Sequence, residues 1–267
     1  MSYPRPATIR RWPGVAALLG GVLLLYYAVP IGSLLVAQSP AAVLARLGDP
    51  GVLAAATTSI VSASLSTGLA VLLGVPLAYW LARTEWRGAG ALTALVVMPL
   101  VLPPVVSGLL LLSVVGPEAP LGSMAQGVGV RLWRSLAGVV LAQTFVASPF
   151  VVLTSKAAFD GVDRELEDAA RTLGEGQFST FRRVTLPLAM PGVLAGVTLA
   201  FARAMGEFGA TLTLAYYPRT MPVEVWVAFS TRGLDAAYPV ALVLLAVAVL
   251  ALAGLSALGR LGSIPPR

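Results

Sequence analysis

The sequence of 267 residues contains neither cysteine nor histidine. Without cysteine the chain has no disulfide, thiolate metal site or thiol nucleophile, and without histidine it lacks the commonest metal ligand and general base. Its single lysine, Lys156, precedes Ala157, so no phosphate-cradling loop of the G-x-x-x-x-G-K-[ST] type is present. We therefore expect no catalytic residues, no metal and no cofactor, and we expect any ATP hydrolysis to reside on another subunit.

Charge is scarce as well. Only 11% of the residues are charged and 57% are hydrophobic, whereas a soluble domain is about one-quarter charged. The net charge of +6 could suggest a nucleic-acid partner, but the arginines flank apolar segments. Basic residues in such positions set the orientation of membrane helices. The composition thus indicates a multi-pass protein of the cell membrane, in contact with lipid and with no nucleic acid.

Six apolar segments meet or exceed the roughly 20 helical residues that cross a hydrocarbon core. They lie near residues 13–37, 52–82, 88–115, 136–156, 188–214 and 239–260. We predict an all-α integral membrane protein with six transmembrane helices, in one domain over residues 1–267. The outer connections are expected to be short loops near 38–51, 116–135 and 215–238.

The basic residues fix an expected orientation. If both termini are cytoplasmic, most arginines and the lysine fall on the cytoplasmic side, as the positive-inside rule requires. That side then holds Arg5, Arg10, Arg11, Arg83, Arg87, Lys156, Arg164, Arg171, Arg182, Arg183, Arg260 and Arg267, and the outside holds Arg46, Arg131, Arg134, Arg219 and Arg232. The same orientation places the charged segment between the fourth and fifth spans in the cytoplasm.

That charged segment, residues 157–187, contains one short predicted helix. Asp163 can cap its start, and Gly174 can adopt the left-handed conformation that ends a helix. An apolar stripe on this helix comprises Leu166, Ala169, Ala170 and Leu173. A helix this short is marginal alone in water, so the stripe calls for a partner. The alternative is an interfacial helix that only lies on the bilayer.

The spacing inside this segment resembles a known signature. Asp168-Ala169-Ala170, three residues, Gly174, nine residues and Val184-x-Leu186-Pro187 are similar to the EAA loop of ABC importer permeases. Asp168 replaces glutamate and Val184 replaces isoleucine. The resemblance implies a type I importer permease whose cytoplasmic coupling helices, between the fourth and fifth spans, dock on an ATPase. The coupling residues would be Glu167, Asp168, Ala169, Ala170, Leu173, Gly174, Val184, Leu186 and Pro187.

Further stretches are similar to molybdate and tungstate permeases. They are Pro99–Val106, Ser148–Val152, Phe201–Thr211 and Ala215–Pro218. The resemblance covers about residues 50–260, which leaves an N-terminal arm and a first helix in 1–37. It implies a homodimer, two cytoplasmic ABC ATPase subunits and an extracellular or periplasmic oxyanion-binding protein. Sulfate and thiosulfate permeases share part of the Phe201–Thr211 pattern and remain the alternative.

Two features inside the spans are candidates for the pathway or its gate. Arg203 and Glu207 stand four residues apart on one helix face, and intramembrane charges are costly and mark function by default. They could tune the passage of an anion, or they could be a structural pair. Pro103 and Pro104 interrupt the third span, and such breaks are tolerated where a helix is buried or lines a cavity. An intramembrane enzyme or a passive channel is disfavoured, because no paired carboxylates occur within a span and a channel has no use for the signature loop.

Overall fold

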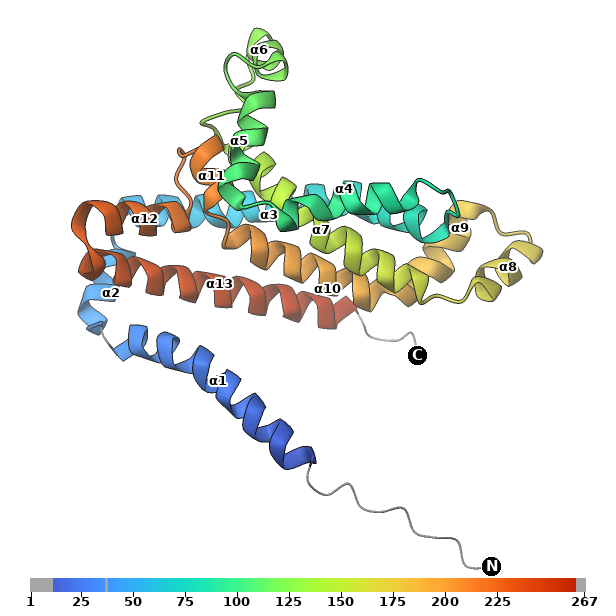
Figure 1. The fold of residues 1–267 in the computed structure, drawn as a ribbon, viewed down its shortest axis with the longest axis horizontal. Helices are drawn as coiled ribbons and strands as arrows, with labels where there is room; N and C mark the ends of the chain where they lie inside the picture. Colours follow the sequence, from blue (N-terminus) through green and yellow to red (C-terminus); the bar gives the residue numbers. More distant parts are fainter. Residues whose placement is uncertain (1–11, 37, 263–267) are drawn as a thin grey trace, which may run out of the picture.

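The computed structural model describes residues 12–36 and 38–262. In this part of the chain every regular element is a helix (Figure 1). The N-terminal arm, Arg5, Arg10, Arg11 and Arg267 lie outside the described residues. The helices are α1 (Trp12–Val36), α2 (Pro40–Leu47), α3 (Pro50–Arg83), α4 (Ala89–Val101), α5 (Pro104–Val115), α6 (Pro120–Gly127), α7 (Leu136–Asp160), α8 (Arg164–Thr172), α9 (Gln177–Thr180), the π-helix η1 (Phe181–Thr185), α10 (Leu186–Met205), α11 (Gly209–Leu214), α12 (Met221–Arg232) and α13 (Leu234–Gly262).

The helices α3, α7, α10 and α13 lie lengthwise against one another and form the body of the protein (Figure 1). Small residues let these helices approach closely, as is typical of membrane bundles. A Cβ built on Gly196 of α10 would overlap Thr154 of α7, and one on Gly192 would lie 2.5 Å from Cβ of Ala158. Gly192 and Gly196, four residues apart on α10, therefore lie on the face of the helix that packs against α7.

Five helices are long and apolar enough to cross a membrane, and α4 with α5 makes a sixth if the two are counted as one span. These correspond to the six predicted apolar segments. Helix α1 differs from the others, because none of the residues in its span Gly14–Val36 is buried. It stands apart from the bundle in Figure 1.

The third predicted span, 88–115, is not one helix. It divides into α4 and α5, whose axes are bent by 115° at Leu102 and Pro103. Proline has no N–H and fixes its own φ, and the residue before it is pushed to extended backbone. Leu102 accordingly has φ −69° and ψ 134°. Helix α5 leaves the bundle sideways and carries α6 at its far end (Figure 1).

The fifth predicted span, 188–214, is also broken. Helix α10 ends at Met205, and the chain turns through Gly206 and Glu207 into the short helix α11. The expected outer loop 215–238 contains a further helix, α12, which packs against α13 and α3. The loops 38–51 and 116–135 likewise contain α2 and α6. Short amphipathic or mixed helices of this kind escape a search for long apolar segments.

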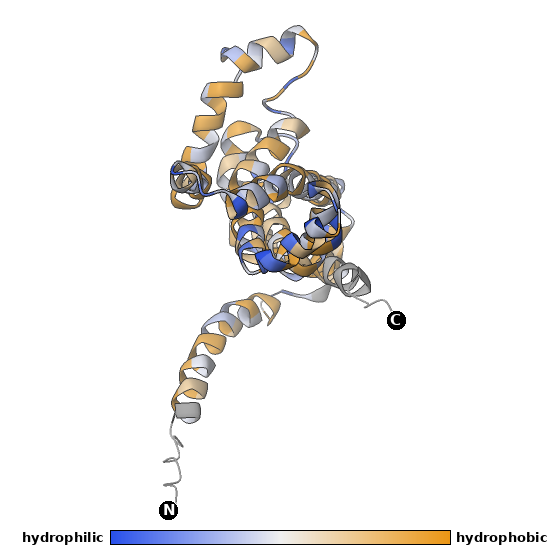
Figure 2. Ribbon diagram, turned by 90° about the vertical axis from the view of Figure 1, so that its right-hand side faces the viewer, coloured by the Kyte–Doolittle hydropathy of each residue, from blue (hydrophilic) through white to orange (hydrophobic). Residues whose placement is uncertain are grey.

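The connection between α7 and α10 forms a polar end of the bundle. It contains α8, α9 and η1, which project beyond the apolar helices (Figure 1). Figure 2 looks at the molecule from this end, where hydrophilic ribbon gathers in front of the bundle. The predicted signature loop therefore lies at one end of the bundle, away from the apolar body.

Candidate functional site

Helix α8 has the boundaries that the sequence predicts. The carboxylate of Asp163 accepts a hydrogen bond from the backbone N–H of Glu165 at 3.0 Å, which caps the helix start. The chain leaves the helix through Gly174, whose φ is +89°. A residue with a Cβ is strained there, although a Cβ would meet no neighbouring atom within 4 Å. Glycine at this position thus serves the turn and not a close contact.

One face of this segment is open to solvent. Leu173 is 86% exposed, Phe178 76% and Leu166 48%. Asp168 and Ala169 are exposed beside them, and Ala170 is half-buried. Exposed apolar side chains in a charged segment make it a candidate for contact with another molecule. Asp168, Ala169, Ala170 and Leu173 lie in this accessible segment, residues 166–178, which we call the docking segment for the role proposed below.

Glu167 behaves differently from its neighbours, because its side chain is only 3% exposed. Its carboxylate accepts hydrogen bonds from Arg83 at the end of α3, with Nη2 2.7 Å and Nε 3.0 Å from Oε1. The hydroxyl of Thr185 in η1 donates to the same oxygen at 2.7 Å. Burial by itself raises the pKa of Glu167, but these hydrogen bonds and the charges of Arg83 and Arg171 bring the pKa below its usual value. Glu167 is therefore held as a carboxylate inside the protein.

The remaining residues of the signature mark the return to the membrane. Val184 lies in η1, and Leu186 and Pro187 begin α10. Val184 and Leu186 are half-buried and Pro187 is exposed. Proline is well tolerated in the first turn of a helix, where its missing N–H has no partner to lose. The π-helical turn before it is a rare element that is frequent at functional sites.

Arg203 and Glu207 form an ion pair at the break between α10 and α11. The Nη2 atom of Arg203 lies 2.5 Å from Oε2 of Glu207, whose side chain is fully buried. The other carboxylate oxygen, Oε1, accepts from the backbone N–H of Ala210 at 2.7 Å. Glu207 thus neutralises Arg203 and also satisfies an amide at the start of α11. The arginine side chain is 27% exposed, so the pair has one buried and one accessible member.

A buried amide side chain, that of Gln143, forms a hydrogen bond with the backbone at the break between α10 and α11. The Nε2 atom of Gln143 in α7 donates to the carbonyl oxygen of Ala204 at 3.0 Å, near the end of α10. Its Oε1 accepts from the hydroxyl of Ser66 in α3 at 3.4 Å. Without water, an unpaired carbonyl here would be costly. Gln143 was not among the predicted site residues; the available signal was a single amide side chain within a predicted span.

The two pathway candidates meet in space. A Cβ on Gly209, two residues after Glu207, would lie 2.9 Å from Cβ of Pro104 and from the backbone nitrogen of Val105. Helix α11 packs against α5 along this contact. The prolines that turn α5 out of the bundle and the charged break before α11 are therefore parts of one junction, which we call the α5–α11 junction (Pro103–Gly108 and Arg203–Thr213).

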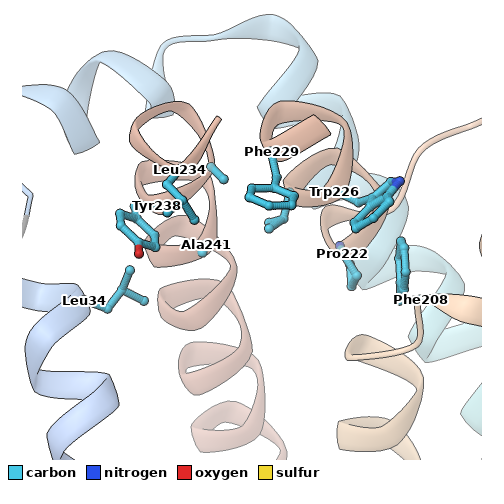
Figure 3. A pocket seen from close by; sticks show the side chains of 10 residues that line it. Leu34, Phe208, Pro222, Trp226, Phe229, Leu234, Tyr238 and Ala241 are labelled. Atoms are coloured by element: carbon cyan, nitrogen blue, oxygen red, sulfur yellow. The ribbon is translucent and has the colours of Figure 1, made fainter. Parts of the chain in front are cut away.

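A hollow at another place in the molecule is apolar. It has a volume of about 380 Å³ and lies where α1 approaches α12 and α13 (Figure 3). No charged residue is among those that line it, and the aromatic rings of Phe208, Trp226 and Phe229 lie next to one another at tilted angles along one side. A site for an anion needs hydrogen-bond donors or positive charge. This hollow has the chemistry of a lipid-facing surface.

The sequence is similar to a known family and to named relatives. Residues 70–262 match the family model of the binding-protein-dependent transport system inner membrane component. The chain is 63% identical over 248 residues to a probable molybdenum ABC transporter permease of Haloferax volcanii, covering 93% of this chain and 91% of that protein. It is 36% identical to a molybdate/tungstate transport system permease of Thermococcus kodakarensis, covering 87% and 90%.

Among solved structures, the chain superimposes on a bacterial alginate ABC transporter in complex with its alginate pentasaccharide-bound periplasmic protein. The TM-score is 0.72 at 16% identity, and the match covers 94% of this chain and 95% of that chain. This likeness concerns the fold. The sequence matches show that the chain belongs to the family of inner membrane components of binding-protein-dependent transport systems, the multi-pass permease subunits of ABC transporters.

Proposed function

We propose that this permease subunit moves a tetrahedral oxyanion, molybdate or tungstate, into the cell, driven by ATP hydrolysis on separate subunits. The observation that carries the proposal is the exposed docking segment, with its EAA-like spacing, at the polar end of an apolar bundle. The names of relatives over most of the chain, a molybdenum permease and a molybdate/tungstate permease, favour these anions over sulfate or thiosulfate. The subunit itself is a permease and not an enzyme.

The docking segment supports contact with a cytoplasmic ABC ATPase. Ala169 and Ala170 have small side chains, so α8 can enter a groove on a partner without steric conflict. Leu173 and Phe178 expose apolar surface that gains free energy when covered. Asp168 adds a charge at the edge of this surface. In a homodimer two such segments would meet two ATPase subunits.

A homodimer is supported by surfaces that a single copy leaves uncovered. Helix α1 has no buried residue in its span, and α5 projects sideways from the bundle. We propose that residues 50–260 form the transport core and that the first helix, within 1–37, is an addition to it. The structural relative in complex with a periplasmic binding protein supports a similar partner on the outer face of this permease.

The α5–α11 junction is our candidate for the pathway and its gate. Arg203 offers positive charge to a passing anion, and Glu207 limits the strength of that attraction so that the anion can leave. A transport site must bind well enough to admit its substrate and weakly enough to release it. Pro103 and Pro104 place a bend beside this pair, at which the outer segments can change their angle.

The docking proposal predicts that Ala169→Arg with Ala170→Arg leaves the bundle folded but weakens association with the ATPase. Two arginine side chains buried in an interface without partners lose their hydration, which costs several kcal/mol for each charge. The measurement is co-purification of the ATPase with the permease from membranes. Gly174→Val tests the same contact by straining the turn at φ +89°. Gln126→Arg on α6 is the control, because it is an exposed position at a distance from α8. Undiminished association in both docking variants contradicts the proposal.

The proposed orientation has cytoplasmic termini and a cytoplasmic docking segment. It predicts that a cysteine at Glu175 reacts with a membrane-impermeant maleimide only from the cytoplasmic side, and a cysteine at Asp235 only from outside. The native chain contributes no background, because it has no cysteine. Labelling is compared in intact cells and in inverted vesicles. Reversed labelling overturns the orientation and with it the ATPase contact.

A further inference from the structure

The buried cluster around Glu167 joins four segments of the chain. Arg83 ends α3, Glu167 lies in α8 and Thr185 lies in η1, which continues into α10. The same guanidinium reaches α7, since its Nη1 donates to the carbonyl oxygen of Phe159 at 2.9 Å. Its Nη2 also lies 3.3 Å from the carbonyl oxygen of Val162, in the turn before α8. The side chain of Arg83 thus connects the ends of α3 and α7 with α8.

Three aromatic rings pack together beside the cluster. The centroid of Tyr79 lies 5.5 Å from that of Phe159 and 4.7 Å from that of Phe181. The Arg83 guanidinium carbon lies 5.9 Å from the Tyr79 centroid. The side chains of Arg83 and Glu167 are only 15% and 3% exposed. Charge-assisted hydrogen bonds in such surroundings are strong, and leaving either partner alone is costly.

These contacts limit how α8 can move. Sliding α8 against the bundle would separate Glu167 from Arg83 and Thr185 and leave its buried carboxylate without these hydrogen bonds. Moving α8 together with the ends of α3, α7 and α10 breaks none of these bonds. The lower-energy motion is therefore a common displacement of the helix and the three spans.

We propose that Arg83, Glu167 and Thr185 form the joint through which a displacement of α8 reaches α3, α7 and α10. Glu167 and Arg83 are then positioning residues, which act through the spans and do not touch the ATPase or the anion. The inference rests on the proposed function, because it presumes that an ATPase moves α8. The two adjacent acidic residues then have different roles. Asp168 faces outward and contacts the ATPase, and Glu167 faces inward and passes the displacement of α8 to the spans.

The test separates binding of the ATPase from use of its energy. Permease, ATPase and the binding protein are reconstituted in vesicles, and molybdate taken up is divided by ATP hydrolysed; sulfate is the second probe. Glu167→Gln keeps the size of the side chain and removes its charge. We expect it to retain the ATPase but to lower uptake per ATP by about tenfold, within the range reported for coupling through such contacts. A residue needed only for folding would lower the amount of transporter and leave this ratio unchanged.

Two further variants complete the test. Glu85→Gln is the matched control, because Glu85 also links the region after α3 to α8, by an exposed pair with Arg164 at 3.3 Å; its ratio is expected to equal that of wild type. Thr185→Val removes one hydroxyl and keeps the shape of the side chain. If Glu167→Gln does not fold, this variant takes its place: a lowered uptake per ATP supports the joint, and an unchanged uptake per ATP refutes it.

The outcomes distinguish the two proposals. A wild-type chain that holds no ATPase refutes the proposed function and the joint with it. A coupled wild type with an equally coupled Glu167→Gln variant refutes the joint alone. Loss of the ATPase in a folded Glu167→Gln variant also overturns the joint, since it makes Glu167 a docking residue.

Discussion

Replacing Gly108 by alanine is expected to destabilise the permease and abolish most of its transport. A Cβ at this position in α5 would overlap Oγ1 of Thr213 and would lie 2.8 Å from the carbonyl oxygen and 2.9 Å from Cα of Ala210. The backbone of α11 cannot yield as the tip of a flexible side chain can. Overpacking of this kind typically costs about 1–3 kcal/mol, and here it separates the two helices of the α5–α11 junction.

Thermal unfolding in detergent and molybdate uptake in vesicles measure the two effects. Gly90→Ala is the matched control, because Gly90 lies in α4 of the same bent pair and a Cβ there meets no atom within 4 Å. Adding Thr213→Ala to the Gly108 variant removes the hydroxyl but not the backbone of Ala210, so only partial recovery is expected. A Gly108→Ala variant as stable and active as Gly90→Ala would show that α11 does not rest on α5 as described.

The boundaries of α8 were predictable from the sequence because local chemistry sets them. Asp163 supplies a cap within its own turn, and Gly174 supplies the backbone conformation that ends the segment. Neither feature depends on a distant contact. The long apolar helices were predictable for a similar reason, since a lipid bilayer demands a minimum length of apolar helix.

Of the two broken spans, only the break in the third was predicted. Pro103 and Pro104 indicated an interruption, but nothing local states that α5 turns by 115°. That angle is stabilised by the close seat of Gly209 against Pro104 and of Gly108 against Ala210, contacts between segments about a hundred residues apart in the sequence. Gly209 allows this close approach of α11 to α5, but nothing in the sequence identifies α5 as its partner.

The sequence also did not show which residues pair with the buried polar groups. From the sequence, Arg83 was expected only to set the topology and Glu167 was expected to be one of several coupling residues. Arg83 and Glu167 are 84 residues apart in the sequence. The pattern of an amphipathic helix can show that one of its faces is buried, but not which distant side chain packs against that face. The exposure of Asp168 beside the burial of Glu167 follows from the tertiary packing of α8 on η1 and α3.

The ion pair at the junction carries the second large expected effect. Arg203→Met leaves a fully buried carboxylate with only the N–H of Ala210 to stabilise it, whereas Glu207→Gln leaves an arginine that is 27% exposed. Breaking a buried pair costs about 3–5 kcal/mol. We therefore expect Arg203→Met to lower the free energy of unfolding more than Glu207→Gln does, as measured by thermal unfolding of the purified permease.

The double variant, Arg203→Met with Glu207→Gln, separates a structural role from a role in transport. Removing both charges is nearly neutral for stability in many buried pairs, and the glutamine oxygen can still accept from Ala210. We expect stability to return while molybdate uptake remains low, because an uncharged junction no longer attracts the anion. Recovery of both properties would make the pair structural and move the pathway elsewhere. Equal stability in all three variants would contradict the burial of Glu207. Low uptake in a stable double variant leaves the charge itself as the missing element, since the cap on α11 and the packing against Pro104 are both retained.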